Sequence, residues 1–430
     1  MKKRVLGLLA GSTAALWGGA ALAANVCPTG SYDVIVSPDG KNYSVPGFDN
    51  WFLDTTGVAN CLFTIPLDTG APAGNIIVYS SDIRGYRFLE AGDEVDLSVD
   101  ENGTEFNFSD DGPADDDIFL SDLVAATDGE VKVDGELELV SNSGGAFASV
   151  DSLDLTELGR ITTPTDQTAA IVHLGATAGL LTGGLQPIEG GNEVGLIGGY
   201  GSYMLGATAR YNLSDGFSVL GGVSLVDQTA GASRTHGVLG AAGLRYVQPG
   251  LDSFRPMAEG GFAVGALGTA YPNVGADVPT GLGTIYVKGG VVSDLAPATQ
   301  LAFYGTLAET GLSSDAFTQT FTGFTVDVPA QTGFFTTVKG TAALTTELAP
   351  TVDLTAEVSA GMVMSHSGMN ATIPGIGSVS AKQDSGFVDY GVRLGWAPQP
   401  AVRLEVFAQG SLGQAVGAHN QVGASAKLTF

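Results

Sequence analysis

The last ten residues, Gln421-Val-Gly-Ala-Ser-Ala-Lys-Leu-Thr-Phe430, are the stretch that decides the fold. Side chains along a strand alternate between two faces, which separates the residues here into an apolar and a polar set. The apolar face carries Val422, Ala424, Ala426, Leu428 and Phe430, and the polar face carries Gly423, Ser425, Lys427 and Thr429. This pattern is typical of the last strand of a membrane β-barrel, which has lipid outside and a polar lumen inside. A strand of a soluble sandwich could alternate in the same way, so the upstream sequence has to decide.

The start of the chain predicts export. Lys2-Lys3-Arg4 is a basic region, Val5 to Ala20 is apolar, and Ala21-Leu22-Ala23 has the pattern of a cleavage site. Residues 1–23 therefore read as a secretory signal peptide. The alternative is a retained membrane anchor, but the apolar stretch is shorter than the roughly 20 residues that a spanning helix needs.

Charge divides the mature chain into two parts. Residues 25–165 contain 27 acidic and 5 basic side chains, whereas residues 166–430 contain 18 acidic and 10 basic ones. The boundary falls near Ile161-Thr-Thr-Pro-Thr165, which has no apolar periodicity. An acidic domain of this kind repels polyanions, so nucleic-acid binding is disfavoured for the first part.

Period-two alternation continues from Glu193 to the C-terminus. In Phe387 to Trp396, for example, valine, leucine and aromatic residues alternate with glycine, aspartate and arginine. A charge on a lipid-facing position near the membrane midplane would cost about 2–4 kcal/mol, while a wet lumen accepts it. The residues that we expect to face the lumen are Arg210, Arg245, Glu259, Lys288, Lys339, Glu357, Asp389, Arg393, Arg403, Glu405 and Lys427.

The connections between these segments predict the topology. Short turns are expected at 213–216, 248–253, 294–298, 348–352 and 397–401, and longer loops at 227–236, 268–281, 310–332, 366–385 and 413–420. Alternating short and long connections are the periplasmic-turn and outside-loop pattern of bacterial barrels. The count from Glu193 is about 12 antiparallel strands, with both ends of the barrel at the periplasmic side.

A helix is expected between the two parts. Thr165 or Asp166 can cap a segment with apolar residues from Ile171 to Leu181, and Gly183-Gly184 would end it. A strand from Ala169 to Leu181 is the competing prediction, because Gly175 and Gly179 disfavour a helix by roughly 1 kcal/mol each.

The first part of the chain predicts a small β-rich domain, with a sandwich as one possibility. Val95 to Phe108 is expected to form a hairpin that turns at Asn102-Gly103. Ala148 to Leu155 is expected to form a strand or a short solenoid rung. Cys27 and Cys61 are the only cysteines, and an exported pair is expected to form one disulfide, with two free thiols as the alternative.

This organisation resembles that of type V autotransporters. The stretch from Asn192 to Leu213, NEVGLIGGYGSYMLGATARYNL, is similar to the autotransporter β-barrel domains of alphaproteobacteria. The resemblance implies insertion by the barrel-assembly machinery, with periplasmic chaperones, through a C-terminal signal that includes Phe430, Leu428 and Ala426. It also implies a helix that threads the pore and an N-terminal passenger outside, although residues 24–160 are too few for a long β-helix.

The search for catalytic chemistry is mostly negative. The four histidines are His173, His236, His366 and His419, so residues 25–165 cannot contain a Ser-His-Asp or Cys-His set. His366-Ser367 is a neighbouring pair, but a solvated loop histidine is the simpler interpretation. Among the aromatic residues, Phe48, Trp51 and Phe52 could form a binding face, with core packing preferred.

One acidic turn is a weak calcium candidate. It contains the five carboxylates of Asp110, Asp111, Asp115, Asp116 and Asp117. Hard oxygen ligands suit Ca²⁺, but the spacing is not that of an EF-hand, and a solvated acidic turn at a strand edge is the preferred alternative. No other cofactor is expected.

The sequence thus predicts an all-β protein of four segments: a signal peptide (1–23), an acidic passenger-like domain (24–160), a linker with a pore helix (161–192) and an outer-membrane barrel (193–430). We expect a non-enzymatic autotransporter-like protein in the lipid of a Gram-negative outer membrane, whose barrel displays the N-terminal domain for adhesion to a host or surface ligand. One alternative is a porin-like channel with a periplasmic or plug domain, and a more remote one is a lipid-modifying barrel enzyme.

Overall fold

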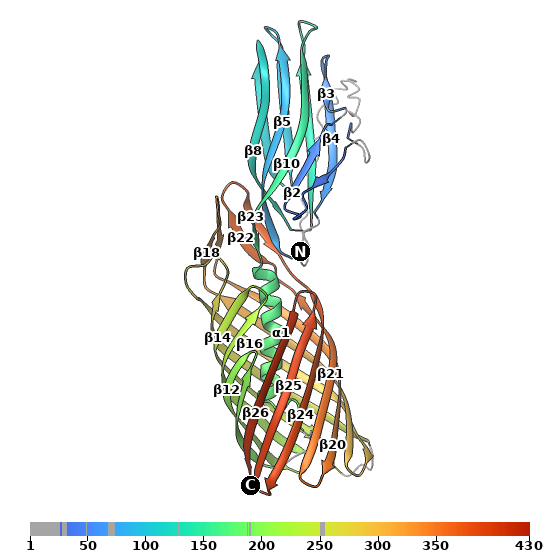
Figure 1. The fold of residues 1–430 in the computed structure, drawn as a ribbon, viewed down its shortest axis with the longest axis vertical. Coiled ribbons are helices and arrows are strands. Elements are labelled where there is room, and N and C mark those ends of the chain that lie inside the picture. Colours follow the sequence, from blue (N-terminus) through green and yellow to red (C-terminus); the bar gives the residue numbers. More distant parts are fainter. Residues whose placement is uncertain are drawn as a thin grey trace, which may run out of the picture.

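The computed structural model describes residues 26–27, 32–48, 50–67, 74–127, 129–186, 188, 191–249 and 254–430. The predicted signal peptide, residues 1–23, lies outside the described residues. Figure 1 shows an elongated molecule in which an N-terminal β-domain stands at one end of a barrel, and the C-terminus lies at the other end. Within the described ranges, no helix is both long and apolar enough to span a membrane.

The C-terminal part is a closed antiparallel barrel of 12 strands, as the alternation predicts. Its strands in spatial order are β11 (Glu193–Tyr200), β12 (Tyr203–Ser214), β13 (Phe217–Ala230), β14 (Ser233–Val247), β15 (Phe254–Ala270), β16 (Val278–Ala296), β17 (Thr299–Ser314), β20 (Gln331–Ala349), β21 (Val352–Ser365), β24 (Ser385–Gln399), β25 (Val402–Gly413) and β26 (Gly417–Thr429). The barrel closes where β26 pairs with β11, with Glu193 opposite Thr429. The predicted turn at Gly201-Ser202 joins the first two strands.

The outer face of the barrel is apolar. On β16, Ile285 and Val287 are 66% and 58% exposed, and Leu428 on β26 is 58% exposed. Next to these residues on the same strands, Lys288 is half-buried and Lys427 is buried. An apolar exterior over a polar interior is the arrangement that a lipid environment requires of a closed barrel.

Two of the predicted long loops are wrong. β13 and β14 are joined by Gly231 and Ala232 alone, and β25 and β26 by residues 414–416. Gly231 in the first connection has a φ of 62° and Gly417, the first residue of β26, has a φ of 71°, a conformation that glycine adopts without steric cost. The polar residues near 227–236 and 413–420 therefore continue the strands instead of forming loops.

Two other predicted loops are long but contain strands. β18 (Phe317–Thr320) and β19 (Thr325–Val328) lie between β17 and β20, and β22 (Met369–Ile373) and β23 (Gly377–Ala381) lie between β21 and β24. The four form a separate sheet in the order β18-β19-β22-β23. We call this the rim sheet. In Figure 1 it lies between the barrel and the N-terminal domain.

The N-terminal domain contains two sheets around one apolar core. The first is ordered β1 (Ile35–Val36), β2 (Asn42–Pro46), β10 (Phe147–Ile161), β5 (Ile76–Leu89) and β8 (Ala114–Ala126), and β3 (Phe52–Leu53) also pairs with β10. The second is ordered β4 (Gly57–Pro66), β9 (Glu130–Val140), β6 (Glu94–Glu101) and β7 (Thr104–Asp111). Val45, Leu97, Leu137 and Leu153 are buried in the shared core. This arrangement is a sandwich of two sheets, which the sequence offered as one possibility.

Local predictions for this domain hold in part. The hairpin of β6 and β7 turns at Asn102 and Gly103, whose φ angles are 52° and 88°, as a two-residue turn requires. The strand predicted from Ala148 is β10, which is longer and is no solenoid rung. Phe48 and Trp51 are core residues, whereas Phe52 is 46% exposed, so core packing was the wrong interpretation for Phe52.

Candidate functional site

The single helix of the described residues, α1 (Thr163–Leu181), lies inside the barrel (Figure 1). A helix, rather than the competing strand, is present. It begins three or four residues earlier than predicted, with Thr162 as N-cap, because Pro164 fits the first turn of a helix, where its missing N–H costs nothing. Asp166 therefore lies in the first turn instead of capping it. Its negative charge near the helix N-terminus is favourable.

Hydrogen bonds hold the first turn of α1 at the end of the barrel that faces the N-terminal domain. Asp166 accepts a hydrogen bond from the backbone N–H of Ala232, at 2.8 Å. A Cβ on Gly231 would lie 2.0 Å from the Asp166 carboxylate, so only glycine allows this close approach. Thr168 donates to the carbonyl of Gln383, at 2.9 Å. The helix entry is thus attached to two separate connections of the barrel.

Arginines from the barrel wall hold the other end of α1. Arg245 of β14 donates to the carbonyls of Thr182 and Ile188, at 3.4 and 3.3 Å, and Arg210 of β12 also donates to Ile188. Cations beside the C-terminal carbonyls of a helix interact favourably with its dipole. Both arginines belong to the predicted lumen-facing set.

The structure places all of the predicted lumen charges on the inner wall. Seven are buried and four, Lys288, Lys339, Glu357 and Arg403, are half-buried. Glu259 forms ion pairs with Arg245 and Lys288, at 2.7 and 2.8 Å. A second network centres on Glu405, whose carboxylate contacts Arg393 at 3.0 Å, Arg403 at 2.9 Å and Lys427 at 3.0 Å. Ion pairs between neighbouring strands therefore link the wall from inside.

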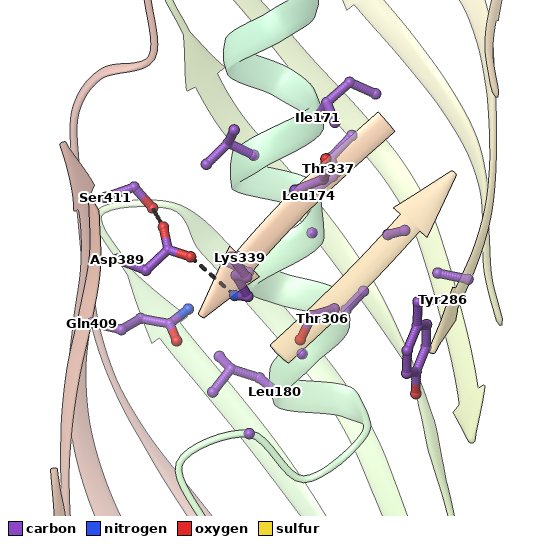
Figure 2. Close-up of a pocket in the computed structure, with 18 of the residues that line it drawn as sticks. Ile171, Leu174, Leu180, Tyr286, Thr306, Thr337, Lys339, Asp389, Gln409 and Ser411 are labelled. Carbon is purple, nitrogen blue, oxygen red and sulfur yellow. Dashed lines mark hydrogen bonds and ion pairs between the residues drawn. The ribbon is translucent and has the colours of Figure 1, made fainter. Parts of the chain in front are cut away.

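The lumen beside α1 is not completely filled. The helix packs mainly against β13 and β14, and a cavity of about 130 Å³ remains toward the opposite wall. In Figure 2, Lys339 points toward Asp389, which also accepts a hydrogen bond from Ser411, while Leu174 and Leu180 cover the helix side. Gly175 and Gly179 also line the cavity, so small residues of the helix leave this space open.

A histidine pair inside the barrel was not predicted. The rings of His173 on α1 and His419 on β26 stack at 4.1 Å, and Ser202 lies 3.1 Å from Nε2 of His419. All three side chains are buried. The residues lie far apart in the sequence, so no local motif could reveal the contact. The pair provides no accessible nucleophile, because α1 covers it.

His366 and Ser367 do not form a catalytic pair in the structure. The ring of His366 contacts the hydroxyl of Thr336, which also donates to Glu309. Ser367 instead accepts a hydrogen bond from the backbone N–H of Phe334, at 3.0 Å. The two neighbours in sequence thus have separate partners.

The five carboxylates of the acidic turn are spread along β7 and β8. Arg87 binds Asp110 at 2.7 Å and Asp116 at 2.6 Å, and Tyr86 donates to Asp115. In the part of the chain that the structure describes, no group of three or more acidic, histidine or cysteine side chains is arranged to hold a metal ion. Calcium binding at this turn therefore stays a prediction, and the arginine already neutralises part of the cluster.

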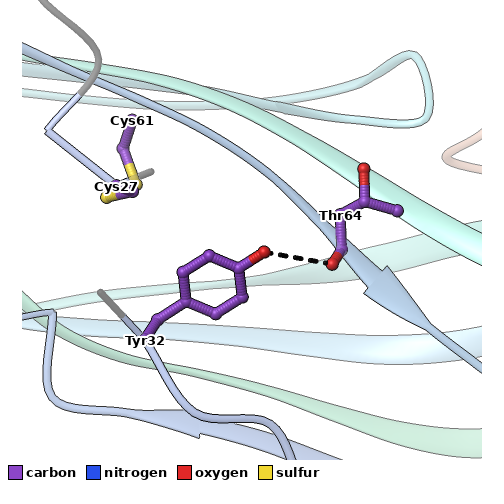
Figure 3. Close-up of a disulfide and its surroundings, with 4 residues drawn as sticks. All are labelled: Cys27, Tyr32, Cys61 and Thr64. Carbon is purple, nitrogen blue, oxygen red and sulfur yellow. Dashed lines mark hydrogen bonds between the residues drawn. A yellow bond between two sulfur atoms is a disulfide. The ribbon is translucent and has the colours of Figure 1, made fainter. Parts of the chain in front are cut away.

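The predicted disulfide between Cys27 and Cys61 is present. It joins residues 34 positions apart and attaches the N-terminal segment to β4. Nearby, Tyr32 donates to the carbonyl of Thr64, at 3.4 Å (Figure 3). Tyr32 also stacks against Phe63 of the core, with ring centroids 4.7 Å apart. The cross-link and this contact close one side of the sandwich.

The N-terminal domain and the rim sheet share an apolar cluster. Ile76, Val78 and Ile161 of the domain are packed in it together with residues of the rim sheet, including Val326, Val328, Met369 and Ile373. At its margin, the ring of Phe321 lies so close to Gly159 that a Cβ there would be 2.5 Å from it. Thr165 also donates to Asn75, at 2.6 Å, across the same junction. The domain is thus packed against the barrel and not merely tethered to it.

Comparisons with known proteins bear on the fold alone. No protein-family model and no curated protein matches the chain. Among solved structures, the translocator domain of the autotransporter NalP from Neisseria meningitidis aligns with 61% of this chain and 97% of its own length, at 12% identity and a TM-score of 0.41.

Two further autotransporter structures are similar to the same extent. The transport unit of AIDA-I from Escherichia coli aligns with 62% of this chain and 98% of its own length, at 10% identity and a TM-score of 0.38. The β-domain of Bordetella BrkA aligns with 56% and 100%, at 13% identity and 0.39. The fold expected from the resemblance, a C-terminal barrel of 12 strands around a helix, is present in this chain.

Proposed function

We propose that this chain is an autotransporter-like protein of a Gram-negative outer membrane, whose barrel anchors and exports the N-terminal β-domain for adhesion or another surface interaction. The observation that carries the proposal is the path of the chain. After β10 the chain turns directly into α1, descends through the lumen and joins β11 at the end of the barrel where the C-terminus lies.

The orientation of the barrel supports display outside the cell. Bacterial barrels have their termini and short turns at the periplasmic side. The N-terminal domain and the rim sheet are both at the opposite end from Phe430 (Figure 1). A barrel inserted in this common orientation would hold the domain at the cell surface.

The proposal does not include an enzymatic role. The N-terminal domain has no histidine, and the Ser202–His419 pair is buried beneath α1. Its acidic surface and exposed aromatic side chains, such as Phe119 and Phe52, are features of a binding domain.

Protease shaving of intact cells tests the display. Cys61 occupies a buried position on β4, so the first epitope tag is placed instead in the exposed turn at Gly144 between β9 and β10. The second tag is placed at Asp215 in the β12–β13 turn. The proposal expects loss of the first tag and survival of the second. Survival of the Gly144 tag together with loss of the Asp215 tag in intact cells would place the domain in the periplasm and overturn the proposal.

A channel is the second candidate, because of the cavity beside α1. Planar-bilayer conductance distinguishes the two: a barrel whose main role is conduction would pass current with α1 in place. We expect a low conductance for the full chain and a rise of about tenfold or more when residues 163–181 are deleted, since the helix occupies most of the lumen. A high conductance of the intact protein would favour the channel.

A further inference from the structure

The N-terminal domain has one long open sheet edge. β8 pairs with β5 on one side, and among the described residues no strand pairs with its other side. At its ends, the carbonyls of Asp117 and Ala125 accept hydrogen bonds from Arg87 and Asn102. The backbone N–H of Leu123 donates to the Asp122 carboxylate, at 2.7 Å, so the open stretch runs from Ile118 to Asp122. Unpaired backbone groups on such an edge can bind another strand.

Other edges of the domain are less available. β8 has 13 residues, whereas β4, β7 and β1 have 10, 8 and 2. The backbone of Val26 already donates to Asn60 on β4, at 2.7 Å. β8 is thus the longest edge in the described part of the domain on which a further strand could be added.

The side chains around this edge include exposed apolar groups. Phe119, within the open stretch, is 57% exposed. At the foot of β8, Leu123 lines a groove of about 450 Å³ together with Phe321, Phe324 and Pro374 of the barrel connections. A strand laid along the edge would reach this groove, which could hold an apolar side chain of the ligand.

Charge identifies the kind of strand. Four aspartates are exposed on β8: Asp115, Asp116, Asp117 and Asp122. Arg87 forms an ion pair with the carboxylate of only one of them, Asp116. The whole chain carries a formal net charge of −27, so a second copy of β8 would be repelled. A segment rich in lysine or arginine would be attracted. Half-buried Leu120 on the core side of β8 would pack against alternate apolar residues of that segment.

We propose that the open edge of β8, with the apolar groove at its foot, binds an extended basic segment of another protein by adding it as a further strand. Backbone hydrogen bonds supply affinity in this mode of recognition, and alternate side chains supply specificity. The proposal rests on the proposed display, since only a displayed domain meets external partners. Binding to the purified chain does not depend on display, so the two proposals can fail separately.

The test uses the full chain in detergent micelles with a synthetic probe, a decapeptide of alternating lysine and valine. We expect binding together with slower hydrogen exchange of the amides between Ile118 and Asp122. The paired substitution Asp117→Lys and Asp122→Lys should weaken binding by about tenfold or more. The matched control, Asp134→Lys and Glu136→Lys on β9, changes the net charge equally on the other sheet and should weaken it less than about twofold.

Four results would overturn the proposal. The first is equal weakening by both paired variants, which would indicate unspecific attraction to an acidic domain. The second is protection of amides outside β8. The third is equal binding of a decapeptide that alternates glutamate and valine. The fourth is a dimer that buries β8 without any peptide.

Discussion

The barrel and the N-terminal domain use carboxylates in opposite ways. In the barrel, the buried side chains of Glu259 and Glu405 each contact two or more cations. In the N-terminal domain, acidic side chains face one another across the sheet of β4, β9, β6 and β7, which we call the outer sheet. Asp96 lies opposite Glu138, and Asp100 lies opposite Asp134. Its buried Glu101 has a serine hydroxyl as partner, at 3.0 Å.

The carboxylates therefore contribute to stability in the barrel and to solubility in the N-terminal domain. Carboxylates in a lumen shielded from bulk water are stabilised by neighbouring cations, and they connect adjacent strands of the barrel wall. Carboxylates on an open sheet face repel each other but keep the domain soluble and select basic partners. Four substitutions or changes of condition test the contrast, from the largest expected effect to the smallest.

Replacing Glu405 should have the largest effect. The change Glu405→Ala leaves Arg393, Arg403 and Lys427 without their shared anion, and breaking a buried pair costs about 3–5 kcal/mol. The midpoint of urea unfolding, followed by heat-modifiable gel mobility, should fall strongly. The control is Asp227→Ala at the exposed Arg234–Asp227 pair, with an expected cost below about 1 kcal/mol. Equal effects of the two substitutions would contradict a stabilising role for the buried carboxylates of the barrel.

Removing the disulfide should destabilise only the N-terminal domain. A pair of Cys27→Ser and Cys61→Ser substitutions should lower its free energy of unfolding by about 2–5 kcal/mol, because the unfolded chain loses a constraint over 34 residues. Fluorescence of buried Trp51 follows the domain, while gel mobility follows the barrel. A loss of barrel stability of the same size would show that the two parts unfold together.

Acid should stabilise the N-terminal domain. Burial raises the pKa of Glu101 to about 8 from its ordinary value of 4.5, so the folded domain binds an extra proton between these pH values. Stability from this group is fully present below pH 4.5 and declines as the pH rises to about 8, with a slope of at most about 1.4 kcal/mol per pH unit. Glu101→Gln should flatten this decline; an unchanged pH profile for that variant would exclude Glu101 as its source.

Relieving repulsion on the outer sheet should have the smallest effect. Asp134→Asn removes one charge from the directly opposed Asp100–Asp134 pair and should stabilise the domain by about 0.2–1 kcal/mol. The gain should shrink in high salt, which screens exposed charges. Asn107→Asp on β7 adds a charge to the same face and should act in the opposite direction. A salt-independent gain would point to a cause other than charge.

Period-two alternation predicted the barrel, its 12 strands and its lumen charges, because the lipid and the lumen select side chains at every position. Two isolated cysteines in an exported chain were enough for the disulfide. The strands of the rim sheet were missed, since segments as short as Thr325–Val328 show little periodicity, and their packing partners lie in the distant N-terminal domain. The contact of Ser202 with His419 was missed because 217 residues separate them.

The most direct test of the central claim is the side of the membrane on which the acidic domain lies. Both native cysteines are in the disulfide, so single cysteines can be introduced at exposed Glu136 on β9 and at exposed Asp215 in the β12–β13 turn. If the domain is displayed at the cell surface as proposed, a membrane-impermeant maleimide labels the first variant in intact cells. It labels the second variant only after the outer membrane is opened. Labelling of Asp215→Cys in intact cells, with Glu136→Cys protected, would contradict this display.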